Sequence, residues 1–142
     1  MKFSCPKEVI LSAVQTTAKA AAGKSTIAAL EGILMELEGN TLTVTGYDLD
    51  LGIKTTIEVN GTESGNIVVG ARKFGDIIRK MPTGDITFEC SDNNNAEISG
   101  RDTNITIMCM SADDYPNVPQ VNPETSFSMP QKLLKSMITQ TK

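Results

Sequence analysis

The sequence has no histidine and no tryptophan among its 142 residues, and only 4% of them are aromatic. Without histidine, the Ser-His-Asp and Cys-His catalytic arrangements, histidine acid–base catalysis and imidazole-dependent zinc sites are excluded. The scarcity of aromatic side chains argues against a platform on which single-stranded bases stack. No apolar run approaches the roughly 20 residues that span a bilayer, and the start, MKFSCPKE, has no apolar signal-peptide core.

Cysteine is also scarce, since the chain has only Cys5, Cys90 and Cys109, far apart and in no CxxC pair. This usage is typical of reduced thiols in an intracellular protein, and we therefore expect a soluble cytoplasmic location. The formal net charge is −4, which excludes binding of polyanions through bulk positive charge. The length suits one domain with a small remainder.

An internal repeat divides the chain. Residues 3–17 read FSCPKEVILSAVQTT and residues 127–141 read FSMPQKLLKSMITQT, at a constant offset of 124 with no gap. Three prolines between 111 and 123 indicate an extended linker. The repeat predicts a first module with its linker over residues 1–123, and the first strand and helix of a truncated second module over residues 124–142.

Hydrophobic spacing predicts helices from Lys7 to about Ala20 and over Ala71–Met81. Alternating or apolar runs bounded by turn residues predict strands over Lys2–Cys5, Ile33–Glu38, Thr41–Thr45, Leu51–Glu58, Asn66–Val69, Asp85–Cys90, Ala96–Ser99 and Asn104–Met110. The order β-α-β-β-β therefore occurs twice. We expect an α+β fold with two helices packed on one side of a curved antiparallel sheet.

Positive charge is concentrated in the helical segments. Residues 7–24, 71–81 and 130–142 hold ten of the thirteen basic residues and only two of the seventeen acidic ones, Glu8 and Asp76. These segments carry a net charge of +8 and the remainder −12. Helix propensity alone predicts mixed signs, because Glu favours helices about as well as Lys. The imbalance favours one basic surface that contacts nucleic-acid phosphates weakly and without regard to sequence.

Two motifs suggest other chemistry and are weak. The segment Ala22–Ser25, AGKS, matches the end of a phosphate-binding loop, but Ala18 stands where that loop needs glycine. Asp48 and Asp50, or Asp113 and Asp114, could be imagined as magnesium ligands, and the alternation at 48–50 would point two carboxylates one way. Because no set of acid, base and nucleophile remains, we expect no catalytic residues, no cofactor and no metal site.

Five stretches resemble the bacterial DNA polymerase III β-subunit family, the processivity sliding clamps. They are MKFSC, KSTIAALEGILMEL, TGYDLDLGI, GARKFGDIIRKMP and DDYPNVP, in order along the chain. The resemblance implies a DNA-clamp fold and a non-catalytic polymerase accessory subunit that closes a homodimeric ring around duplex DNA. Its subunit has three similar domains, of which this chain would hold the first and the opening of the second. The family often has proline where this sequence has Ala28.

The resemblance also implies site residues. Lys24, Arg72 and Arg79 match basic positions that face DNA in the family, and charge spacing adds Lys19 and Lys73. The strand that the family pairs with the other subunit matches Asn104, Ile105, Thr106, Ile107 and Met108. The peptide pocket that recruits the polymerase and the clamp loader lies mostly in domains beyond this chain.

Two alternatives stay open at this point. The basic helices could bind an acidic protein partner, making the chain a protein-interaction module. A metal-dependent nuclease using Asp48, Asp50 or Asp113 is the third hypothesis, for which magnesium-dependent cleavage of DNA would be the sign.

Overall fold

The computed structural model describes all residues from Met1 to Lys142. Its helices are α1 (Lys7–Ala18), α2 (Ala71–Lys80) and α3 (Gln131–Thr141), with short 3-10 helices η1 (Ala28–Glu31), η2 (Ala112–Asp114) and η3 (Pro123–Thr125). Its strands are β1 (Lys2–Pro6), β2 (Gly32–Glu38), β3 (Thr41–Tyr47), β4 (Gly52–Glu58), β5 (Asn60–Glu63), β6 (Gly65–Gly70), β7 (Asp85–Cys90), β8 (Asn95–Ser99) and β9 (Asn104–Met108). No helix is both long and apolar enough to cross a bilayer.

The strands form two antiparallel sheets, in the orders β5-β1-β7-β8-β9 and β4-β3-β2-β6. Each β-α-β-β-β half contributes its first strand to the other half's sheet: β1 pairs with β7, and β6 pairs with β2. The α+β class and the antiparallel pairing are confirmed. Strand β5 was not predicted, because its sequence NGTE has no apolar alternation.

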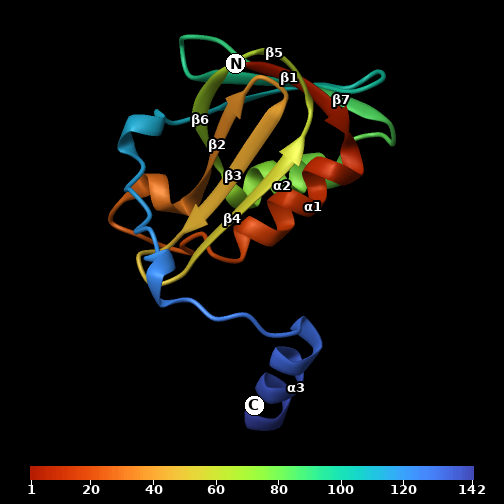
Figure 1. Ribbon diagram of the computed structural model, residues 1–142. Helices are drawn as coiled ribbons and strands as arrows, with labels where there is room; N and C mark the ends of the chain where they lie inside the picture. The colour runs from red at the N-terminus through yellow and green to blue at the C-terminus, as the bar shows by residue number, and fades with distance from the viewer.

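Helices α1 and α2 lie side by side on the same side of β2, β3 and β4 (Figure 1). Helix α1 buries Ile10, Ala13, Val14 and Thr17 at helical spacing. Gly46 in β3 allows this close approach, because a Cβ there would lie 2.0 Å from the carbonyl oxygen of Thr17. The interior between helices and sheets contains 24 buried residues. Within it the Phe88 ring stacks on Phe3 at 5.4 Å and meets Phe74 edge-on at 5.8 Å.

The segment after β9 differs from the predicted linker. Residues 111–118 fold back onto the domain as a strap (residues 111–118, the name used below), in which η2 leads to the buried Tyr115. The Tyr115 hydroxyl donates to the backbone oxygen of Thr45 at 3.3 Å, and Met110 pairs with Val68 of β6. The prediction of a linker from Ser111 is therefore wrong for residues 111–118, because the Tyr115 side chain adds to a small apolar cluster with Leu30, Tyr47 and Val68.

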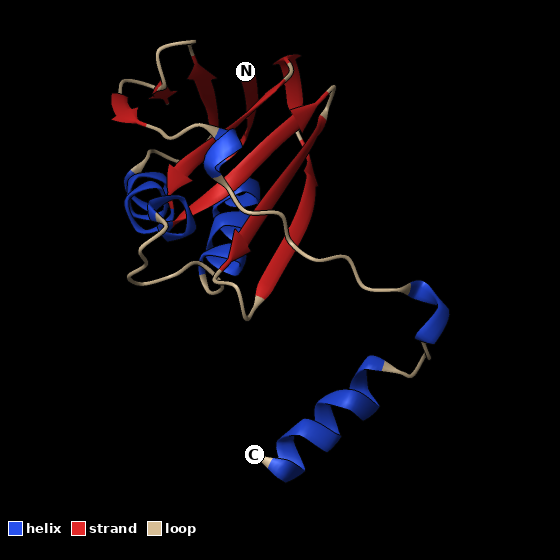
Figure 2. Cartoon of the chain, turned by 90° about the vertical axis from the view of Figure 1, so that its left-hand side faces the viewer, coloured by secondary structure: helices blue, strands red, loops and turns tan.

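From Pro119 onward the chain leaves the domain, and α3 lies apart from it (Figure 2). The predicted helix of the second copy is present as α3. The predicted strand before it is not, because residues 126–130 have no neighbouring strand to pair with. The division of the chain at residue 123 into two domains remains a prediction.

Candidate nucleic-acid interface

A groove of about 450 Å³ runs between α1 and α2. Its apolar floor is Val14, Ala18, Ala71 and Gly75. These side chains are short, and the longer polar side chains lie on the rims. The polar residues that line it are Gln15, Lys19, Arg72, Asp76 and Arg79.

Three of the five predicted DNA-contacting residues thus meet in this groove. Lys19, at the C-terminal end of α1, lines the groove together with Arg72 and Arg79 of α2, and all three are exposed. Neither Lys19 nor Arg72 forms an ion pair in this structure. Their charged groups are therefore free to contact an anion in solution.

Lys24 lies close to the same surface, on the loop that follows α1. A second hollow, continuous with the groove through Ala18, Ala71 and Arg72, includes Gly23, the neighbour of Lys24. Glu31 holds the loop by accepting from the backbone N–H of Ser25 at 3.0 Å. The loop follows a helix rather than a strand, so Ala22–Ser25 lacks the strand-loop-helix frame of a phosphate-binding loop.

Lys73 does not line the groove. Helix α2 buries Ala71, Phe74, Gly75 and Ile78, and successive residues on a helix differ by about 100°. Lys73 is therefore on the exposed side of α2 away from the Arg72–Arg79 row. The lysines of α3 also lie elsewhere, since that helix is separate from the domain (Figure 2).

One acidic side chain lies inside the basic row. The Asp76 carboxylate Oδ1 accepts a hydrogen bond from Nη1 of Arg79 at 3.0 Å, one helical turn away. Both side chains are more than half exposed, at 51% and 58%. Of the residues that line the groove, Asp76 is the only acid and Arg79 the only base with an ion-pair partner.

Lys7 belongs to the basic helical segments by sequence but has a structural role. Its Nζ donates to the backbone oxygens of Arg79 at 2.8 Å and Met81 at 2.6 Å. These carbonyls end α2, where the helix dipole favours a cation. Lys7 therefore caps the C-terminal end of α2 and does not contribute its positive charge to the groove.

The opposite face of β2, β3 and β4 is acidic and polar. In β2 the side chains of Met35 and Leu37 enter the core toward the helices, whereas Glu36 and Glu38 are exposed on the other face. Glu36, Glu38 and three threonines line a shallow hollow there, together with Lys54. The basic groove between α1 and α2 and the acidic face of the sheet therefore lie on opposite sides of the domain, whereas the predicted single basic surface does not include Lys7, Lys73 or the lysines of α3.

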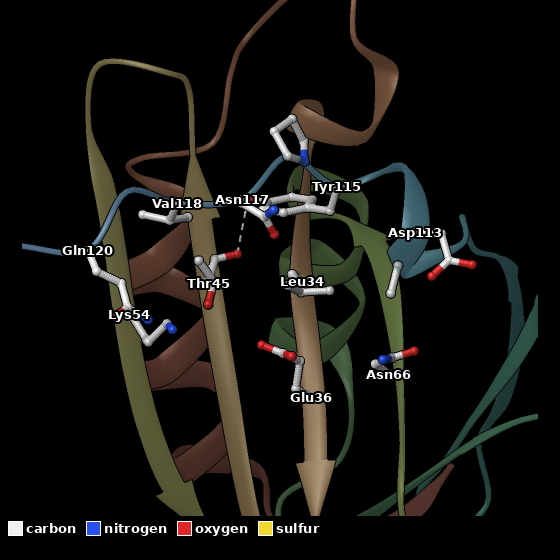
Figure 3. A pocket seen from close by; sticks show the side chains of 12 residues that line it. Leu34, Glu36, Thr45, Lys54, Asn66, Asp113, Tyr115, Asn117, Val118 and Gln120 are labelled. Carbon is white, nitrogen blue, oxygen red and sulfur yellow. Dashed lines mark hydrogen bonds between the residues drawn. The ribbon is translucent and has the colours of Figure 1, made fainter.

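A polar cavity of about 480 Å³ lies between this sheet face and the strap (Figure 3). The Thr45 hydroxyl in it is buried without a hydrogen-bond partner. Burial raises the pKa of the neighbouring Tyr115 to about 12, so its phenol remains a hydrogen-bond donor at neutral pH. The strap was missed from sequence, although Tyr115, an aromatic residue directly before the first linker proline, was a signal that it packs.

The aspartates considered as metal ligands have structural explanations. Residues 48–51 form a turn rather than a strand, so the expected alternation of Asp48 and Asp50 is wrong. Asp48 Oδ1 accepts from the backbone N–H of Leu51 at 2.7 Å and of Asp50 at 3.0 Å, and these bonds lower its pKa. They also hold Leu49 at a φ of 80°. No group of three or more Cys, Asp or Glu residues is placed to hold a metal ion.

The three cysteines are unpaired, with Cys5 and Cys109 buried and Cys90 half-buried. Burial raises the pKa of Cys5 to about 11 and that of Cys109 to about 12. Both thiols are therefore protonated at neutral pH, and a protonated thiol is a poor nucleophile.

Strand β9, predicted to be a subunit-interface strand, is at an edge of the five-stranded sheet. It pairs with β8 on one side only, which leaves the backbone groups of the other side unpaired. Ile107 is buried, and the next side chain, Met108, is 85% exposed. The strand is thus placed where another chain could extend the sheet.

Comparison with known proteins gives one consistent result. The family model described as "DNA polymerase III beta subunit, N-terminal domain" matches residues 1–119. The Beta sliding clamp of Bacillus subtilis (strain 168) is 30% identical over 149 residues, which cover 99% of this chain and 39% of the relative. The Beta sliding clamp of Staphylococcus aureus (strain Mu50) is 28% identical, with 99% and 40% covered.

Solved structures agree with these sequence matches. The sliding clamp of Bacillus subtilis superposes with a TM-score of 0.94 at 29% identity, covering 99% of this chain and 39% of the other. A putative DNA polymerase III beta subunit from Eubacterium rectale gives 0.92 at 34% identity, covering 99% and 38%. The chain spans about two fifths of the length of the curated relatives it matches. With the family model matching most of its length, this chain belongs to the DNA polymerase III beta subunit family.

Proposed function

We propose that this chain is the DNA-facing first domain of a sliding clamp, a processivity factor that tethers a replicative polymerase in the bacterial cytoplasm. The observation that carries the proposal is the groove between α1 and α2. It gathers Lys19, Arg72 and Arg79, while Glu36 and Glu38 lie on the opposite face of the domain. A polyanion is thus attracted to one side and repelled from the other.

The same groove explains why contact with duplex DNA would not depend on sequence. Lys19, Lys24 and Arg72 are exposed, with long side chains at the end of a helix, on a loop and on a helix face. Charged groups of this kind contact phosphates, which carry no sequence information directly. The role of the domain in replication would therefore be to hold DNA rather than to react with it.

We further propose that residues 104–108 of β9 form the subunit interface of a homodimeric ring in the whole protein. The free backbone groups of this edge strand and the exposed Met108 support this. The polymerase and the clamp loader would bind domains beyond this chain. Since a closed ring holds DNA by topology, the isolated domain needs only weak contact with it.

Titration of a labelled duplex at about 50 mM and about 200 mM salt tests the DNA-binding proposal. We expect binding near the nonspecific limit, with a Kd of roughly 10⁻⁴ M or weaker at physiological salt and a steep loss as salt rises. Arg72→Glu should weaken binding at low salt by about tenfold or more, since it replaces a phosphate contact by a repulsion. Circular dichroism should show the fold unchanged, because Arg72 is exposed.

Arg101→Glu is the matched control, because Arg101 is an exposed arginine on the turn between β8 and β9. It changes the net charge equally and leaves the groove intact. Equal effects of the two variants would mean that net charge, and not the groove, determines binding. Tight binding that ignores salt, or binding only to an acidic protein, would contradict the proposal.

A further inference from the structure

We infer that Asp76 is an internal competitor of DNA, holding Arg79 in an ion pair that a DNA phosphate must displace. This inference rests on the proposed DNA-binding function and concerns how strongly the groove binds. Asp76 would be a positioning residue that limits affinity, since its carboxylate touches Arg79 and not the nucleic acid.

The position of Asp76 supports this role. It lies on α2 between Arg72 and Arg79, on the row that lines the groove. The other acid of the helical segments, Glu8, is in the first turn of α1 and does not line the groove. Asp76 is therefore the one acid that lines the groove itself, whereas Glu31, in the adjoining hollow, accepts from the backbone N–H of Ser25.

The geometry of the Asp76–Arg79 pair shows which group the carboxylate and a phosphate would compete for, namely the Arg79 guanidinium. Nη1 of Arg79 donates to Oδ1 of Asp76 at 3.0 Å, a direct hydrogen-bonded ion pair. An arginine offers five N–H donors in a planar fork, and this fork suits a phosphate as well as a carboxylate. The same guanidinium can thus exchange one oxygen acceptor for another with little movement of its side chain.

The exposure of the pair makes the exchange easy. Both side chains are more than half exposed, and exposed ion pairs are weak and screened by salt. A passing phosphate can displace Asp76, and Asp76 can recapture Arg79 when the phosphate moves on. Lys19 and Arg72 form no ion pair in this structure, so the groove contains two unpaired cations and one exchangeable one.

The functional consequence is a limit on how tightly the groove holds duplex DNA. A protein that moves along DNA needs contacts that form and break readily. An acid within the basic row lowers the affinity of one contact without removing the charge that attracts DNA in the first place.

The test is a thermodynamic cycle with Asp76→Asn, Arg79→Gln and the double variant in the full chain. Duplex binding is measured by titration over a series of salt concentrations. Asp76→Asn should tighten binding at about 50 mM salt by about two- to five-fold, the range that an exposed ion pair spans. The slope of log K against log salt should become steeper by up to about 0.9, the limit for one whole added phosphate contact, because Asp76 occupies Arg79 for only part of the time in the wild type.

In the Arg79→Gln background the same Asp76→Asn change should have no effect on the slope and little on affinity. If the change tightens binding equally in both backgrounds, Asp76 acts only through its charge, and the inference is wrong. Asp113→Asn is the matched control, because Asp113 is exposed on the strap at the far face (Figure 3). It should leave the slope unchanged.

The outcomes separate this inference from the proposed function. If wild type and Arg72→Glu bind equally, or neither binds, the DNA-binding proposal fails and the inference fails with it. If Arg72→Glu weakens binding while Asp76→Asn leaves the slope as it was, the proposed function stands and only the competition is refuted.

Discussion

Residues 3–17 and 127–141 have matching sequences but different surroundings (Figure 2). In the first copy Phe3, Ile10 and Val14 are 1% exposed or less. Their counterparts Phe127, Leu134 and Ile138 are 83%, 45% and 56% exposed. Both copies nevertheless form a helix directly after a proline, Pro6 or Pro130, at nearly the same backbone angles.

The contrast between the two copies shows which features depend on the local sequence and which depend on the surrounding fold. A helix satisfies its own backbone groups, so Gln131–Thr141 is helical without a neighbour. A strand needs a partner, so residues 2–6 form β1 between β5 and β7, whereas residues 126–130 form none. The local sequence specifies the helix in both copies. Pairing of the strand and burial of the apolar side chains depend on the surrounding fold.

The largest expected effect on stability is the difference between replacing Phe3 and replacing its counterpart Phe127. Phe3→Ala removes a ring stacked on Phe88 in the core and should lower the free energy of unfolding by about 3–5 kcal/mol. Phe127→Ala should change it by less than about 0.5 kcal/mol, since that ring is exposed. Urea denaturation measures both. If Phe3→Ala does not fold, Phe3→Leu provides a milder version, and equal effects at the two positions would refute the comparison.

A smaller loss of stability should follow from disturbing the contact between β3 and α1. Gly46→Ala places a Cβ against the Thr17 carbonyl, where β3 meets the end of α1. We expect a loss of about 1–3 kcal/mol in unfolding free energy, as for other overpacked sites. Gly23→Ala is the control, because a Cβ there meets nothing within 4 Å. A stable Gly46→Ala protein would show that α1 does not need this contact.

The smallest change in stability should come from deleting the second copy of the repeat. Deletion of residues 121–142 removes η3 and α3, and the strap with Tyr115 remains. The midpoint of urea unfolding of the domain should shift by an amount equivalent to less than about 0.5 kcal/mol. A larger loss would mean that α3 packs on the domain in solution, contrary to its separation here.

The same distinction explains which parts of the fold were predictable. Both helices of the domain and eight of its nine strands follow from apolar periodicity, within a few residues at their ends. The assignment of strands to two sheets did not, because the exchange of β1 and β6 depends on contacts between residues far apart in sequence. The polar β5 and the strap around Tyr115 were missed because neither has a periodic pattern.

The candidate site was predictable to a similar extent. Charge counting identified the helices that carry it, and the structure places Lys19, Arg72 and Arg79 in one groove. Sequence could not show that Lys7 caps α2 or that Lys73 points away from the groove, since both depend on how the two helices pack. The pairing of Arg79 with Asp76 is a local i,i+3 contact and could have been expected from spacing alone.

The mutual exchange of first strands has a consequence for how the domain folds. Each half completes its sheet with a strand belonging to the other, so neither half has a finished sheet when alone. Neither half should therefore fold without the other, and the whole domain is expected to form in one cooperative step.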